Sequence, residues 1–91
     1  MALTKEIVVD KIEVLENGIV QVRTATRVLE DGTQLSQSYH RHYVEPSTNI
    51  DGSWADTDIS GEDARVQAIA NATWTAEVKT AYQDMIDAQA L

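Results

Sequence analysis

The sequence predicts an α+β fold, with a three-stranded antiparallel β-meander over about residues 5–45, a loop, and two C-terminal helices. Two observations predict the sheet: an Asn-Gly step and an Asp-Gly step each join runs rich in β-branched residues, which is a strong signal for tight hairpins. A third predicts the helices, because beyond residue 60 apolar side chains recur every three to four positions. We therefore expect the two helices to pack on one face of the sheet.

The first hairpin is predicted at Glu16-Asn17-Gly18. If these three residues form the loop, with the glycine in the left-handed conformation, Val14 pairs with Val20. Two positions further from the turn, Ile12 then pairs with Val22. A two-residue loop would instead place polar residues opposite the first strand's apolar side chains, so the three-residue loop is preferred because it builds an apolar face.

The second hairpin is predicted at Asp31-Gly32, as a two-residue loop that pairs Thr24 with Tyr39. In a regular register, one face of the sheet then holds a mainly apolar set: Val8, Ile12, Val14, Val20, Val22, Val28, Leu35, Tyr39 and Tyr43. The same face also receives three polar side chains near its ends or edge: Asp10, Gln37 and Arg41. Arg41 is the least compatible of these, and we expect its guanidinium to reach solvent or an acid.

Residues 46–59 are predicted to form a loop, because Pro46 cannot donate to a strand ladder and polar residues and glycine follow it. Trp54 lies within this segment. It has two interpretations: the indole folds back over the core as a lid, or it contacts a partner, as exposed aromatic residues often do.

The C-terminal part, residues 60–91, is predicted to be helical, with helices at about 61–72 and 76–89. Ser60 is the expected N-cap of the first, followed by acids in the first turn. The expected buried stripes are Val66, Ile69, Ala70, Thr73 and Trp74, and then Val78, Ala81, Tyr82, Met85 and Gln89. We expect residues 1–91 to form a single domain, with the meander in 1–45.

Composition narrows the classes of function. The 91 residues include no Cys, which excludes disulfides, thiolate zinc sites and a thiol nucleophile. The net charge is −8, and residues 45–91 carry nine acids against two bases, so a nucleic-acid partner is not expected. No apolar run has membrane-spanning length and no export signal is recognisable, so we expect no membrane association and synthesis in a cytoplasm.

The two histidines, His40 and His42, form a His-x-His pair, a spacing that can chelate zinc on a strand. In the predicted register both lie on the sheet face away from the helices, in line with Arg23 and Lys11. Because these neighbours are positively charged, they disfavour the binding of a metal ion by the histidines. The histidines are therefore interpreted as part of a polar face that contacts solvent or a partner.

A second candidate, Asp56 to Gly61, resembles the first half of a calcium-binding loop. Its second half fails, because Asp63 and Gln67 stand where the motif needs an aliphatic residue and a bidentate Glu. No cofactor is expected. Since no nucleophile–base motif and no glycine-rich phosphate loop is present, we expect no enzymatic activity.

Five runs of the chain resemble a family of short proteins encoded among the virion structural genes of marine tailed bacteriophages, cyanophages especially, often near tail or fibre genes. The runs are V9-D-K-I-E-V14, Q21-V-R-T-A-T26, S38-Y-H-R-H42, S60-G-E-D-A-R-V-Q-A-I-A70 and W74-T-A-E-V-K-T-A-Y82. The resemblance implies a small virion- or tail-associated structural component, located in the virion, with no enzymatic residues to carry over. Its implied partners are other virion proteins or further copies of itself.

The predicted function is that of a non-enzymatic phage structural or assembly protein that acts through protein–protein contacts. The candidate interface consists of Tyr39, His40, Arg41, His42 and Tyr43 on the outer third strand, together with Trp54. An unpaired outer strand invites pairing with another chain, so a homo-oligomer is one expectation. The alternative is a small acidic effector that binds a host protein, for instance by imitating the charge of nucleic acid.

Overall fold

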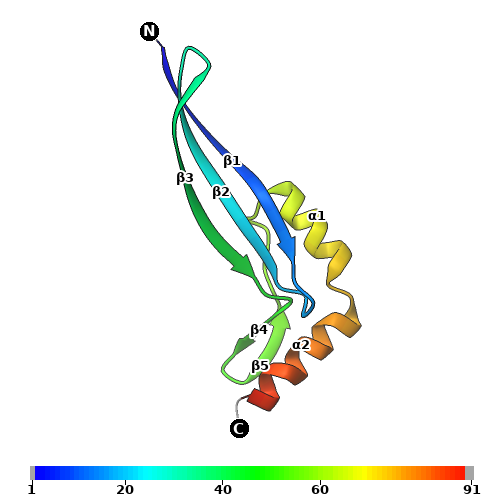
Figure 1. The fold of residues 1–91 in the computed structure, drawn as a ribbon. Coiled ribbons are helices and arrows are strands. Elements are labelled where there is room, and N and C mark those ends of the chain that lie inside the picture. The colour runs from blue at the N-terminus through cyan, green and yellow to red at the C-terminus, as the bar shows by residue number, and fades with distance from the viewer. Residues whose placement is uncertain (1, 90–91) are drawn as a thin grey trace.

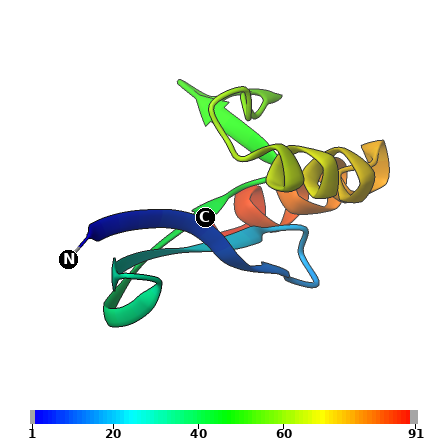
Figure 2. The same cartoon turned by 90° about the horizontal axis from the view of Figure 1, so that it is seen from above.

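The computed structural model describes residues 2–89, so Met1 and residues 90–91 of the predicted domain lie outside it. The elements are β1 (Leu3–Val14), β2 (Val20–Glu30), β3 (Thr33–Val44), β4 (Ser47–Ile50), β5 (Ser53–Asp56), α1 (Ala64–Thr73) and α2 (Ala76–Gln89). The predicted α+β fold is confirmed: an antiparallel sheet in the order β1-β2-β3 is followed by two helices. Both helices lie on one side of this sheet, and the far ends of its strands extend well beyond them (Figures 1 and 2). The principal extents are 58 × 26 × 22 Å.

The turn between β1 and β2 has the predicted three-residue loop. Leu15 N donates to the Ile19 carbonyl at 2.9 Å, and Gly18 has a φ of +92°. Val14 pairs with Val20, as predicted. The left-handed conformation at position 18 costs a glycine little, which is why this residue type closes the loop.

β1 contains a bulge at Asp10, because Val9 pairs with Thr24 while Lys11 pairs with Arg23. One extra residue reverses the side-chain alternation beyond it. Val9, rather than the predicted Val8, therefore packs against the core.

A second bulge lies in β3. The Asp31-Gly32 loop has two residues, as predicted, but Val28 pairs with Ser36 instead of Leu35. This shift of one residue continues along the strand, and every later side chain of β3 moves to the other face of the sheet. The predicted pairing of Thr24 with Tyr39 is therefore wrong.

The bulges have a common physical effect on the two faces. The face toward the helices, here called the covered face, carries Val20, Val22, Ile12 and Val9 and is the side of the core. The regular register would have placed Asp10, Gln37 and Arg41 on that side. Burying such groups without partners costs several kcal/mol each, on the order of 2–7. The bulges place all three on the opposite side, here called the open face.

The core lies between β2 and the first helix. Its buried members are Val20, Val22, Val66, Ala70 and Trp74, with Val9, Ile12, Val44, Ile59 and Val78 packed around them. The predicted apolar stripe of α1 is thus centred on the sheet. Helix α2 contributes Val78 to this core, while most of its length lies over a second, smaller sheet.

That second sheet lies in residues 46–59, which were predicted to be a plain loop. β4 and β5 pair as a hairpin around Asp51 and Gly52, whose φ angles of +51° and +87° match those of the turn at residues 31–32. Gln83 on α2 donates to the Ser47 hydroxyl at 2.9 Å. The hairpin therefore packs against α2 at the end of the molecule opposite the turn between β2 and β3 (Figure 1).

The two helices begin at different kinds of cap. The N-cap of α1 is Asp63 and not the predicted Ser60, because the Asp63 carboxylate accepts from Arg65 N at 2.8 Å. The Ser60 N–H instead donates to Asp58, and this backbone bond lowers the pKa of the Asp58 carboxyl. α2 begins after Thr75, close to the predicted position. Within residues 2–89, no helix has the length and hydrophobicity needed to cross a membrane.

Candidate interaction surface

Three cations lie side by side on the open face. Lys11 pairs with Arg23, and Arg23 pairs with Arg41, so each strand of the sheet contributes one member at the same level. We call these three residues the cationic row. Like charges directly opposite one another destabilise a sheet, so this arrangement requires nearby compensation.

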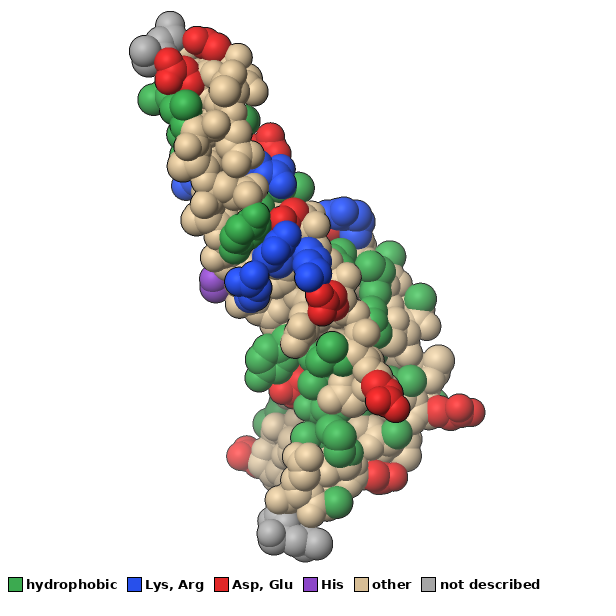
Figure 3. All heavy atoms as spheres, viewed as in Figure 1, with side chains coloured by type: hydrophobic (Ala, Val, Ile, Leu, Met, Phe, Trp, Pro, Cys, Tyr) green, Lys and Arg blue, Asp and Glu red, His purple; other side chains and the backbone are tan. Residues whose placement is uncertain are grey.

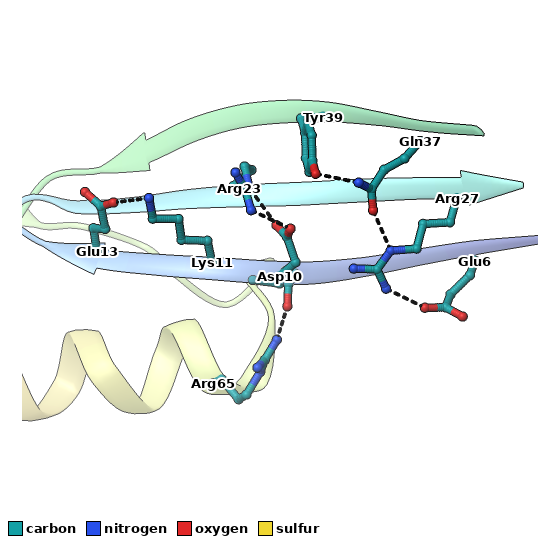
Figure 4. A network of polar contacts seen from close by, with 10 residues as sticks. Glu6, Asp10, Lys11, Glu13, Arg23, Arg27, Gln37, Tyr39 and Arg65 are labelled. Atoms are coloured by element: carbon teal, nitrogen blue, oxygen red, sulfur yellow. Dashed lines mark hydrogen bonds and ion pairs between the residues drawn. The ribbon is translucent and has the colours of Figure 1, made fainter. Parts of the chain in front are cut away.

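Two acids from β1 compensate part of the row (Figure 4). Arg23 donates to both oxygens of Asp10, at 3.0 and 2.8 Å, and Lys11 lies 2.6 Å from Glu13. The bond from Arg23 lowers the pKa of the Asp10 carboxyl and raises that of the guanidinium, and the bond from Lys11 lowers the pKa of Glu13. Arg41 has no ion pair and no side-chain hydrogen bond within residues 2–89.

Tyr39 lies against the cationic row. The Arg23 guanidinium is 4.3 Å from the centre of the tyrosine ring, and that of Arg41 is 5.9 Å away. Gln37 donates to the Tyr39 hydroxyl and accepts from Arg27, which also pairs with Glu6 at 2.8 Å (Figure 4). These hydrogen bonds orient the tyrosine, whose residue stays 45% exposed, while Arg23 is held separately by its own ion pair.

A shallow hollow of about 190 Å³ lies beside the row. Its walls include all three cations and one acid, Glu13, together with Gln21 and the exposed Tyr43. Arg65, from α1, does not line the hollow; its guanidinium donates to the Val9 carbonyl in β1 (Figure 4). In the space-filling view, Lys and Arg side chains gather at the middle of the open face, with acidic side chains both among them and toward the two ends (Figure 3).

The two histidines are not on this face, contrary to the prediction. His40 pairs with Thr24 and His42 with Val22, which places both rings on the covered face, with centroids 6.3 Å apart. His42 Nε2 shares a hydrogen bond of 2.7 Å with a Glu62 oxygen, and the two side chains are 36% and 22% exposed. In the part of the chain that the structure describes, no three His, Cys, Asp or Glu side chains form a group that would hold a metal ion.

Trp54 is partly buried and packs edge-to-face against Tyr82, with ring centroids 6.1 Å apart and planes at 78°. Of its two interpretations, this contact fits the intramolecular one, although the indole covers the second hairpin and α2 rather than the main sheet. Burial raises the pKa of the Tyr82 hydroxyl to about 12, and the neighbouring Glu45 adds to this shift. A partner contact at Trp54 stays a prediction.

The structure therefore divides the predicted interface residues into three places. Tyr39, Arg41 and Tyr43 share the open face, the histidines lie on the covered face, and Trp54 belongs to the second sheet. Sequence reasoning missed Lys11 and Arg23 as members of the surface. The sequence did carry a signal of the error: the regular register put three polar residues on the apolar face, and bulges move them to the other face.

No protein-family model, curated protein or solved structure matches this chain.

Proposed function

We propose that this chain is a non-enzymatic structural or assembly protein of a tailed bacteriophage, a small tail- or virion-associated component that acts through contacts with other virion proteins or with itself. The phage assignment is supported by the resemblance of the five sequence runs given above. The mode of action is supported by the open face and the strand at its edge.

The observation that carries the proposal is the exposure of β3. This strand forms one edge of the sheet over its full length, and all of its residues except His42 and Val44 are exposed. Within residues 2–89 no strand pairs with its outer side, so backbone N–H and C=O groups there are available to pair with another chain. Such an edge is favourable for a protein whose role is to bind neighbouring subunits.

The side chains of β3 support the same role. Leu35, Tyr39 and Tyr43 are 55%, 45% and 60% exposed, and Arg41 lies between the two tyrosines. Tyrosine and arginine are among the residue types that most often anchor protein–protein interfaces, because they combine a large contact area with hydrogen bonding or charge.

Mass spectrometry of purified particles of the phage that carries this gene tests the proposal. A virion component is expected at a fixed copy number relative to the major structural proteins, and it should persist through repeated density-gradient purification. Its absence from particles, combined with its presence in infected cells, would contradict the proposal and favour the small acidic effector.

A further inference from the structure

We propose that the cationic row binds the acidic outer face of helix α2 from a second copy of this chain, in a head-to-tail contact. This inference rests on the proposed function, because it names the partner of the open face. The occupant is identified by charge complementarity between two surfaces of the same molecule.

The receptor surface is the cationic row itself. It places three positive groups abreast at a cost in sheet stability, and Asp10 and Glu13 offset only two of them. Arg41 is left over, exposed and beside the hollow. An external carboxylate at this point relieves the repulsion within the row and gains charge-assisted hydrogen bonds.

The complementary surface is a stripe of three carboxylates on α2. Glu77, Asp84 and Asp87 are exposed, at spacings that place them on the side of the helix away from buried Tyr82. None of the three has an ion pair within residues 2–89. The only base on the helix, Lys79, is already paired with Asp56 at 2.9 Å.

The spacings of the two surfaces agree. Two strand-to-strand steps separate Lys11 from Arg41, which is about 10 Å at the usual spacing of about 4.8 Å. Seven residues of helix separate Glu77 from Asp84, which is also about 10 Å at about 1.5 Å per residue. A helix laid across the strands therefore brings one carboxylate to each end of the row.

The two surfaces are different parts of the molecule, so the contact is heterologous and repeats from copy to copy, as a closed ring or an open chain. Each copy carries a charge of −8, and this general repulsion is screened over about 8 Å at physiological ionic strength. The contact therefore depends on local pairs, and high salt weakens it.

Charge reversal tests the contact, with the oligomeric state read by size-exclusion chromatography with light scattering and the dissociation constant by analytical ultracentrifugation. Arg41→Glu and Asp84→Lys are each expected to weaken self-association, raising its dissociation constant at least about tenfold. Lys5→Glu is the matched control, since it makes the same charge change on an exposed residue of the same sheet, outside the row. Circular dichroism checks that all three variants remain folded.

Mixing the two variants is the decisive step. Each variant alone loses its contact, but the mixture offers both a native pair and a charge-swapped pair, so association should return. The inference is overturned if the wild type stays monomeric at millimolar concentration, if Lys5→Glu weakens association as much as Arg41→Glu, or if the mixture stays monomeric. Any of these results leaves the particle composition, and with it the proposed function, to be decided independently.

Discussion

The indole N–H of Trp74 donates to the carbonyl of Gly18 at 2.7 Å, across 56 positions of sequence. The bond is buried, and it ties the C-terminal end of α1 to the loop between β1 and β2. It therefore links the first hairpin, which positions the cationic row, to the helical part that covers its reverse side.

Replacing Trp74 with Phe retains an aromatic ring but removes the donor. The Gly18 carbonyl is then left buried without this partner, which should lower the free energy of unfolding by about 1–3 kcal/mol, in addition to the loss of packing volume. Urea denaturation measures this difference. Trp54→Phe is the control, because no hydrogen bond of the Trp54 indole is found within residues 2–89; equal losses in both variants would contradict the role of the bond.

Gly18 and Gly32 offer a matched pair for backbone effects. Both have positive φ, but a Cβ at position 18 would lie 2.6 Å from Val78 Cγ1 and 2.9 Å from Pro46 Cγ, whereas a Cβ at position 32 meets nothing within 4 Å. We expect Gly32→Ala to cost about 1–2 kcal/mol, the ordinary price of a left-handed alanine. Gly18→Ala should cost about 1–3 kcal/mol more, because of overpacking. Similar losses in the two variants would show that the loop is not packed against α2 as described.

The pKa of Tyr82 predicts an alkaline transition. The native state raises this pKa from 10.0 to about 12, so it holds the phenolic proton more tightly than the unfolded chain does. The resulting stability is complete below pH 10 and is lost as the pH rises toward 12. The loss amounts to about 3 kcal/mol, at about 1.4 kcal/mol per pKa unit. Denaturation at a series of pH values should show this decline in the wild type and a shallower one in Tyr82→Phe; parallel profiles would contradict it.

The pair formed by His42 and Glu62 fastens the segment before α1 to the covered face. A double-mutant cycle with His42→Ala and Glu62→Ala should give a coupling of about 0.5–1.5 kcal/mol near neutral pH, the usual net value of a hydrogen bond. His40→Ala, combined with the same Glu62 change, should show no coupling, because His40 has no bond to that carboxylate. Equal coupling at the two histidines would mean that the register of β3 differs from the one described.

Much of the fold follows from local sequence signals. The Asn-Gly and Asp-Gly steps predicted both turns of the main sheet, and helical spacing located α1 and α2 to within a few residues. The hairpin at Asp51-Gly52 was missed because its flanks, S-T-N-I and S-W-A-D, are short and mostly polar, and so lack the β-branched runs that make such a step persuasive.

The bulges were the main limit. A bulge adds one residue without any fixed sequence signature, so periodicity alone gave a regular register for β3 and reversed the faces of its side chains. The candidate interface was therefore assigned to the correct strand, β3, but its side chains were assigned to the wrong faces. Tyr39, Arg41 and Tyr43 were expected beside the core, and the histidines on the open face. The sequence indicated this error, because the regular register placed the charged side chain of Arg41 on a face predicted to be apolar.

The register of β2 and β3 decides which side chains form the open face, and interstrand proton contacts in an NMR spectrum of the isotope-labelled protein measure it directly. Cross-strand contacts joining Ala25 with Tyr39 and Thr24 with His40 are expected from the observed pairing. Contacts joining Thr24 with Tyr39 instead would return the tyrosines and Arg41 to the helix side and dismantle the cationic row.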